Sequence, residues 1–238
     1  MANEPEDLSK TNDLKNIVSR FTNEQVSTPV FVANVLREAI ISGTLPPHSL
    51  VRQDTAADSM GVSKIPVREA LRTLEGENLI SFERNRGARV LPGSITEMME
   101  IFELRKVIEP HLLTLSIPNL SDLDLQQAQS LVEQETKSTN QQELGELNRK
   151  FHEAILSGAR ETIGYRFQTI LFTSSERYLR LSLKEPQSQT RSNSEHQQLI
   201  AACVGRDMDG ARAILVKHLE SAQAVIHEKL QQDKTVDP

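Results

Sequence analysis

Apolar residues recur with the period of an α-helix through most of this chain of 238 residues. In the segment 64–75, Val67, Leu71 and Leu74 stand at positions i, i+4 and i+7, which places them on one face of a helix. The basic residues of the segment are four positions apart and share a second face: Lys64, Arg68 and Arg72. The pattern therefore predicts a short helix that is apolar on one side and basic on another.

The residues before this helix predict how the chain enters it. The segment 53–60 has the composition of a short helix and ends at Gly61, where glycine allows a tight turn. Ser63 is suited to cap the following helix through its hydroxyl, and Pro66 falls in the first turn, where no backbone N–H is needed. Helix, glycine turn and helix form the helix-turn-helix pattern, whose second helix enters the major groove of DNA. The alternative is a small helical domain with a solvated basic face.

Two flanking segments extend this unit. Residues 79–91 predict two short strands joined by a basic turn at 85–87, which together form a wing. The wing is expected to carry three arginines towards phosphates or the minor groove: Arg84, Arg86 and Arg89. Upstream, residues 30–42 predict the first helix of the same domain, and Gly43 ends it. We therefore expect a winged helix-turn-helix domain over residues 28–92.

Beyond a joint at Pro92 and Gly93, the apolar period stays helical and predicts no strand. The first of about six helices opens with a capping box at residues 94–97, and Pro110 is expected to kink it. The six helices begin near residues 94, 121, 143, 163, 188 and 207. In the fourth we expect an inward apolar face made of Phe167, Ile170, Leu171 and Tyr178. The expected fold is mainly α: the winged domain followed by an antiparallel helical bundle over residues 93–232.

Composition and charge narrow the class of protein. The net charge is −6 and the acidic excess lies mostly in the C-terminal part, so DNA affinity depends on local clusters of basic residues. No apolar run has the length of a membrane span, and the single cysteine, Cys203, excludes an internal disulfide and fits a reducing, cytoplasmic compartment.

Residues 1–27 are polar, and we expect a mobile tail there. A short amphipathic helix is the alternative, with an apolar face of Leu14, Ile17, Val18 and Phe21.

Residues 62–75 (VSKIPVREALRTLE) and 86–90 (RGARV) resemble the GntR family of bacterial transcription regulators, and residues 36–45 match that family's first helix and following turn. The resemblance implies that the start of the recognition helix lies over bases and phosphates, that Arg52 contacts the DNA backbone and that Gly87 marks the wing tip. The expected DNA-binding residues are Arg52, Ser63, Lys64, Pro66, Arg68, Arg72, Arg86 and Gly87. Lys64 replaces the family's more common arginine, so we expect phosphate contact there rather than base readout.

A second group of polar residues lies in the predicted bundle. Asn148 and His152 share one helix face, while His196 and His218 lie on two later helices. Imidazole suits zinc and similar ions, although a histidine on a helix face is more often a hydrogen-bonded structural residue.

The motifs Asn148-x-x-x-His152, Glu195-His196 and His218-Leu219 resemble the metal-binding subgroup of the FadR-type C-terminal domain, the FCD domain, found in many GntR regulators. The resemblance implies a divalent metal ion, zinc first with nickel or manganese as alternatives, held by Asn148, His152, His196 and His218. Asn148 stands where aspartate is usual and is a poorer donor, which weakens the expected affinity.

Arg105 has two interpretations. It stands four positions before Glu109 on the same helix, so the two can form a surface ion pair. The resemblance instead favours a place near the metal, where the guanidinium binds the carboxylate of an effector.

These patterns together predict a transcriptional regulator rather than an enzyme. We expect a homodimer that binds a near-palindromic operator in double-stranded DNA. We expect no association with a membrane. By resemblance to the family, we expect a repressor that a small carboxylate releases from DNA by binding at the metal. Three alternatives remain: the metal itself is the signal, the three histidines form a metalloenzyme, or the pocket works without metal.

Overall fold

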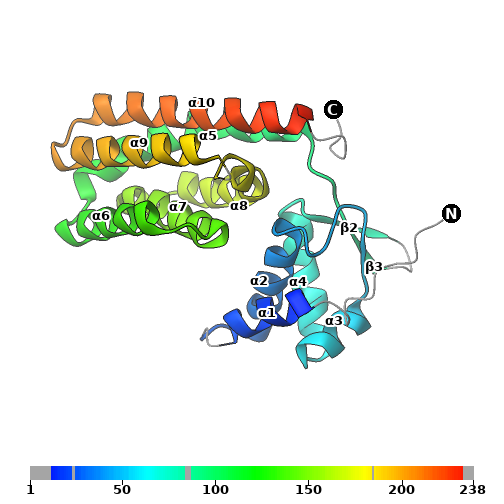
Figure 1. The fold of residues 1–238 in the computed structure, drawn as a ribbon. Helices are drawn as coiled ribbons and strands as arrows, with labels where there is room; N and C mark the ends of the chain where they lie inside the picture. The colour runs from blue at the N-terminus through cyan, green and yellow to red at the C-terminus, as the bar shows by residue number, and fades with distance from the viewer. Residues whose placement is uncertain (1–11, 23–24, 84–86, 184, 233–238) are drawn as a thin grey trace. The chain divides into compact units, whose positions relative to one another are not determined.

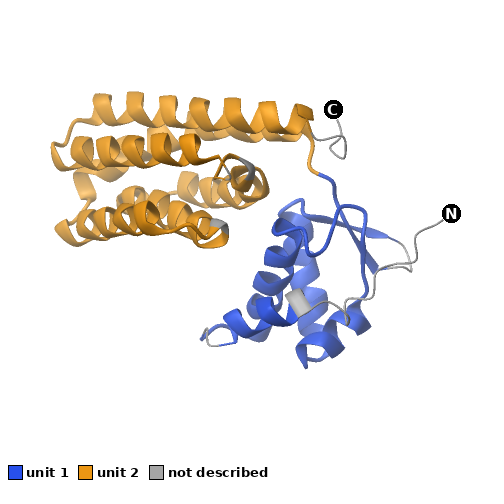
Figure 2. Ribbon diagram, in the orientation of Figure 1, with its two compact units in different colours: residues 1–92 blue, residues 93–238 orange. Residues whose placement is uncertain are grey.

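The computed structural model describes residues 12–22, 25–83, 87–183 and 185–232. The chain divides into two compact units, residues 1–92 and 93–238, shown separately coloured in Figure 2. Figure 1 shows the elements of each unit.

The first unit packs helices against a small antiparallel sheet. The sheet has the strand order β1-β3-β2, with Leu50 opposite Arg89 and Ile80 opposite Val90. Its elements are α1 (Asn12–Phe21), α2 (Thr28–Ile41), β1 (Leu50–Val51), α3 (Gln53–Met60), α4 (Lys64–Gly76), β2 (Ile80–Glu83) and β3 (Gly87–Val90). The expected helix-turn-helix and wing are therefore present, with β1 as an additional strand that is too short to leave a pattern in the sequence.

The turn into α4 follows the expected geometry in part. Gly61 ends α3 in the left-handed conformation, with φ at 65°, which a residue with a side chain rarely adopts. The apolar face of α4 is completely buried at Val67, Leu71 and Leu74. Ser63 occupies the N-cap position, but its side chain makes no cap hydrogen bond, so the expected hydroxyl cap is wrong.

Gly87 is required by the close approach of β1 to β3. Its φ is 112°, and a Cβ built on it would lie 2.7 Å from the carbonyl oxygen of Val51. A larger residue would push the strands apart. The turn before it, which includes Arg84 and Arg86, lies outside the described residues.

Part of the expected mobile tail is structured. Residues 12–21 form α1, and Leu14 and Ile17 are buried in the core of the first unit against α2. The mobile tail is therefore wrong for this segment, and the amphipathic helix is right. The apolar face of α1 covers α2, and that burial stabilises a helix too short to persist alone.

The second unit is a bundle of long helices, so the antiparallel helical bundle is confirmed. They are α5 (Ile95–Ser116), α6 (Asp122–Lys137), α7 (Gln141–Ile155), α8 (Ile163–Leu183), α9 (Pro186–Val204) and α10 (Met208–Gln232), with short 3-10 turns at Ile117–Asn119 and Ser157–Ala159. Helix α5 runs on through Pro110. At its start, Ser94 caps the backbone N–H of Glu97, and the Tyr178 hydroxyl on α8 accepts from the Ser94 N–H at 3.1 Å.

Helix α8 differs from the expectation. Tyr178 is buried, but Phe167 and Ile170 are 56 % and 51 % exposed, so they do not form an inward face. The buried side of α8 mixes the polar residues Gln168 and Ser175 with the apolar residues Phe172 and Leu179. The prediction was right for Tyr178 but wrong for Phe167 and Ile170, because the packing of α8 against its neighbours decides which of its apolar residues are covered.

No helix within the described ranges is both long and apolar enough to cross a membrane.

The packing of α1 makes a first prediction. Replacing Ile17 with alanine should lower the unfolding free energy of the first unit by about 2–5 kcal/mol, because it leaves a cavity against α2. Amide hydrogen exchange in α2 and α4 reports this unit separately and should become faster. Lys15→Ala on the exposed side of α1 is the matched control, and equal exchange in both variants would contradict the packing.

Candidate metal centre and nucleic-acid interface

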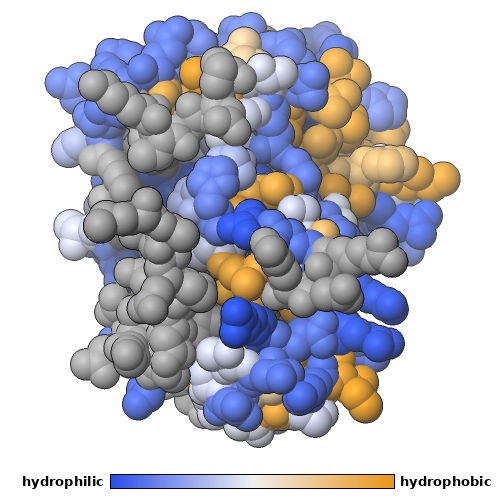
Figure 3. All heavy atoms as spheres, turned by 90° about the vertical axis from the view of Figure 1, so that its right-hand side faces the viewer, coloured by the Kyte–Doolittle hydropathy of each residue, from blue (hydrophilic) through white to orange (hydrophobic). Residues whose placement is uncertain are grey.

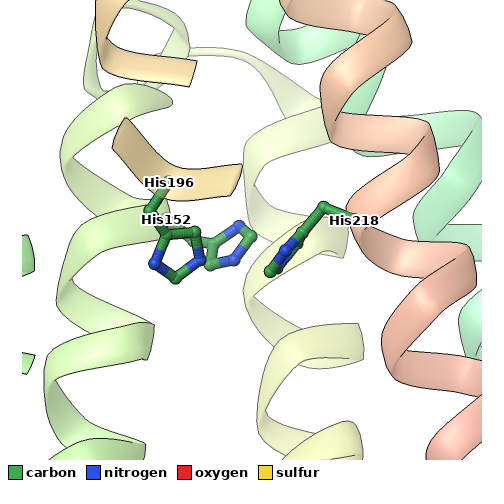
Figure 4. A group of neighbouring side chains, drawn as sticks. All are labelled: His152, His196 and His218. Carbon is green, nitrogen blue, oxygen red and sulfur yellow. The ribbon is translucent and has the colours of Figure 1, made fainter. Parts of the chain in front are cut away.

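Three buried histidines meet inside the second unit. His152 on α7, His196 on α9 and His218 on α10 are 0 %, 0 % and 5 % exposed. Figure 4 shows their rings turned towards one another, and each offers a nitrogen such that these atoms all lie within 4.8 Å of one another. Side chains that lie 22 to 66 positions apart in sequence therefore converge on one point.

Behind each imidazole stands a buried carboxylate. In each pair the imidazole Nδ1 faces a carboxylate oxygen. The distance is 2.9 Å from His196 to Glu135, 2.9 Å from His218 to Glu195 and 3.4 Å from His152 to Glu109. In the two hydrogen-bonded pairs, at His196 and His218, the ionised carboxylate can only accept, so it favours the tautomer with the proton on Nδ1 and leaves the Nε2 lone pair free. Such carboxylate–imidazole pairs orient histidines that bind metal ions.

The free nitrogens at the centre are otherwise unsatisfied. The Nε2 atoms of His152 and His196 are buried and have no hydrogen-bond partner among the described residues. Leaving buried polar atoms unpaired is costly, so native proteins usually supply a partner or a ligand. A divalent ion that accepts imidazole nitrogens meets this need. The donor set therefore fits a metal ion.

Asn148 is the remaining expected ligand. It is 5 % exposed on α7, one turn before His152, and it lines the same cleft as His218. An amide oxygen would complete the three imidazole nitrogens as a four-donor set, and Asn148 is the expected source of it.

The electrostatics keep these groups in the protonation states that a metal requires. Burial lowers the pKa of His152 from 6.5 to about 3, so its imidazole is neutral at pH 7. Burial alone would raise the pKa of Glu109, but the charge of Arg105 and the contact with His152 outweigh it and lower that pKa to about 2. Burial also lowers the pKa of His218. Metal binding at neutral pH then releases no proton from these two histidines.

Arg105 lies in the interior instead of on the surface. It is 1 % exposed, and its Nε donates to the Oε1 atom of Glu109 at 2.6 Å. Its Nη1 donates to Ser175 Oγ at 3.2 Å, and its guanidinium lies 5.1 Å and 4.7 Å from the ring centroids of Phe102 and Phe172. The expected Arg105–Glu109 pair exists, but the surface location was wrong. Glu109 then connects this pair to His152.

The three carboxylates behind the histidines were missed from the sequence. Glu195 precedes His196 directly, yet it faces His218 on α10, while His196 is held by Glu135 on α6. Neighbours in a helix point about 100° apart, so adjacency in sequence did not mean contact. Only the helical spacing of Glu109 from Arg105 was visible beforehand.

The first unit presents the expected basic face. Arg52, at the N-cap of α3, is exposed, as are the basic residues of α4: Lys64, Arg68 and Arg72. Ser63 is exposed and Pro66 is partly exposed in the first turn of α4. Ile65 was overlooked: it is 71 % exposed at the start of this helix, where an apolar side chain can contact a thymine methyl group.

Two of the basic residues are already paired. Lys64 Nζ lies 2.8 Å from Asp54 Oδ1, and this hydrogen bond raises the pKa of Lys64. Arg89 pairs with Glu83 and also donates to the carbonyl oxygen of His48. Arg89 therefore braces the sheet, which differs from its expected reach towards phosphates.

The lowered pKa of His152 predicts acid sensitivity of the metal-free protein. An unfolded histidine takes up a proton as the pH falls below 6.5, whereas folded His152 takes one up only near 3. Stability is therefore fully present above pH 6.5 and declines below it, by about 2 kcal/mol at pH 5 from this one group. Thermal unfolding of the metal-free protein at pH 7.5 and 5.0 measures the decline. His152→Gln should show a smaller decline, and an equal one would refute this origin.

The pairs also predict an indirect effect on metal affinity. Glu135→Gln removes the charge behind His196 and should weaken metal binding about 10–100-fold, because the imidazole becomes less basic. Competition with a chelator measures the affinity, and circular dichroism checks the fold. Glu133→Gln, on the exposed face of the same helix, is the control and should match the wild type. Unchanged affinity in Glu135→Gln would exclude a metal at His196.

Two family models match the chain. Residues 29–90 match the bacterial regulatory proteins of the gntR family, and residues 100–221 match the FCD domain. These matched ranges contain the helix-turn-helix and the three histidines respectively.

Individual proteins agree with these models. The chain is 29 % identical to the uncharacterized HTH-type transcriptional regulator BphR of Paraburkholderia xenovorans, over 85 % of this chain and 90 % of that one. It is 27 % identical to the HTH-type transcriptional repressor GlaR of Escherichia coli, over 82 % of this chain and 94 % of GlaR. A GntR family regulator from Pseudomonas syringae, known from its crystal structure, is 30 % identical in sequence. The match covers 92 % of this chain and 94 % of that one, with a TM-score of 0.53.

The chain therefore belongs to the GntR family of bacterial regulators with an FCD domain, and it is a DNA-binding transcriptional regulator.

Proposed function

We propose that this regulator is a repressor, and that a small organic acid releases it from DNA by binding at a divalent metal ion in the bundle. The observation that carries the proposal is the buried cluster of three histidines, each backed by a carboxylate. The similarity to GlaR, which is named a repressor, supports the direction of regulation.

In this proposal, α4 lies in the major groove of DNA and contacts it through its basic face. Arg68 and Arg72 contact phosphates or bases, and Arg52 contacts the backbone beside α3. Lys64 exchanges Asp54 for a phosphate, which is feasible because both side chains are well exposed, at 66 % and 70 %. Arg86 and Gly87 extend the contact through the wing.

An exposed apolar surface supports a homodimer. Leu104 and Val107 on α5 are 51 % and 71 % exposed, and α8 packs against α5. On α8 the exposed apolar residues follow a helical stripe: Ile163, Phe167 and Ile170. Figure 3 shows one view of the surface, where apolar residues gather in groups among hydrophilic ones. A second copy covering the same stripe satisfies two-fold symmetry, which matches a near-palindromic operator.

Asn148, His152, His196 and His218 are the proposed ligands. Zinc suits this mixture of imidazole and amide donors, and nickel or manganese are the alternatives. A bound ion supplies a positive centre to which an effector carboxylate can bind. The effector then releases DNA only as far as it binds the two states of the protein differently.

Two rival functions are less well supported by the site. A signalling metal has to exchange, whereas the Nε2 atoms of His152 and His196 are buried, which favours a resident ion. A metalloenzyme needs a general base, whereas each of the three carboxylates faces an imidazole Nδ1.

DNA binding through α4 can be tested by charge removal. Arg68→Ala should weaken binding to the upstream region of the protein's own gene and reduce the salt slope by about 1, because one phosphate contact is lost. Fluorescence anisotropy over a salt series measures both quantities. Arg212→Ala, an exposed arginine on α10, is the control. If both variants behave as wild type, α4 is not the DNA-binding helix as proposed.

The regulatory proposal is tested by comparing wild type with His196→Ala. Wild type should carry about one metal ion per protomer and release the DNA when carboxylates are added, while the variant should lose both properties and keep DNA binding. Deleting the gene should raise expression from its target promoter. Lower expression after deletion would contradict repression.

A further inference from the structure

Arg105 has a structural role beside the metal centre. Its Nε and Nη1 atoms donate to Glu109 and Ser175, and two aromatic rings lie beside its guanidinium. Losing this pair would leave the fully buried Glu109 without its counter-charge, which is strongly unfavourable. Because Arg105 is only 1 % exposed, an acid that arrives from solvent meets a more exposed cation first.

A cleft beside the metal centre contains such a cation. It lies between α7, α8, α9 and α10, has a cavity volume of about 20 Å³ and reaches both Asn148 and His218. Arg191 on α9 is the only lysine or arginine among the described residues that line it. The lining also contains the carboxylate of Glu195, several serine hydroxyls, including those of Ser188 and Ser221, and apolar side chains.

The position of Arg191 suits a ligand that enters from solvent. The side chain is exposed, and its Nη2 donates only a long hydrogen bond of 3.4 Å to the backbone oxygen of Ser221. Within the described parts of the chain, no carboxylate forms an ion pair with it. Its fork of donors is therefore available for a carboxylate.

Glu195 is the opposing charge in this cleft. Its carboxylate faces His218 Nδ1 at 2.9 Å and accepts from Ser221 Oγ at 3.4 Å, so it is turned towards α10. A metal ion on the three histidines and the charge of Arg191 together offset it. An anion placed between the ion and Arg191 meets positive charge on two sides.

We propose that Arg191 binds the carboxylate of the effector at the mouth of the metal pocket. This inference rests on the proposed function, in which a small organic acid binds at the metal. Because Arg191 and Glu195 also line a neighbouring outer groove with Lys217, the same arginine stands where the acid enters.

The test is isothermal titration of zinc-loaded, full-length protein with acetate, L-lactate, L-malate and D-gluconate. Arg191→Gln should weaken binding of the acids that wild type binds by about 10–100-fold, because a charge-assisted pair is lost. Arg191→Lys keeps the charge without the fork and should bind with an affinity between those of wild type and Arg191→Gln, which a merely structural role would not produce. Lys217→Gln removes a charge from the outer groove outside the cleft and should bind as wild type does.

The outcomes separate this inference from the proposed function. If Arg191→Gln binds the acids as tightly as wild type, the role of Arg191 is overturned and the metal-dependent effector remains. If Lys217→Gln loses as much affinity as Arg191→Gln, the acids are attracted by the local positive charge and not bound by a specific contact with Arg191. The inference then fails. If wild type binds none of the acids, the inference fails together with the proposed organic-acid effector.

Discussion

The buried pairing of carboxylates with imidazoles is the constraint on which the second unit depends. Glu109 on α5 and Glu135 on α6 hold histidines of α7 and α9, while Glu195 on α9 holds the histidine of α10. Five helices are thus joined through polar contacts beside the hydrophobic core of the bundle. Since a buried carboxylate is costly when it loses its hydrogen-bond partner, the site and the fold are not independent.

Helix α8 supplies no member of the histidine cluster, yet it connects two parts of the bundle. Phe172 and Ser175 contact the Arg105 guanidinium beside the site, and Tyr178 accepts a hydrogen bond from Ser94 at the start of α5. Its buried side mixes polar and aromatic residues for these contacts, while Ile163, Phe167 and Ile170 lie on the surface. One helix therefore combines a role in the site with a surface suited to a second copy.

The first unit uses its charges in two ways. Arg89 pairs with Glu83 and donates a hydrogen bond to the His48 carbonyl oxygen, so it stabilises the sheet that forms the wing. Lys64 is paired at the surface with Asp54, in a contact that phosphate can replace. The basic face of α4 therefore carries side chains whose pairing is weak or absent, as the proposed contact with DNA requires, although the chain as a whole is acidic.

The sequence by itself determined the elements with local causes: the apolar period of α4, the glycine turn before it, the six long helices and the histidines on three of them. It did not determine the two-residue strand β1, the packing of α1, the exposed side of α8 or the carboxylate behind each histidine. The partners His196 and Glu135 are 61 positions apart, and those of His218 and Glu195 are 23 apart. Periodicity says which residues share a helix face, but only the packing of helices against one another decides what each face meets.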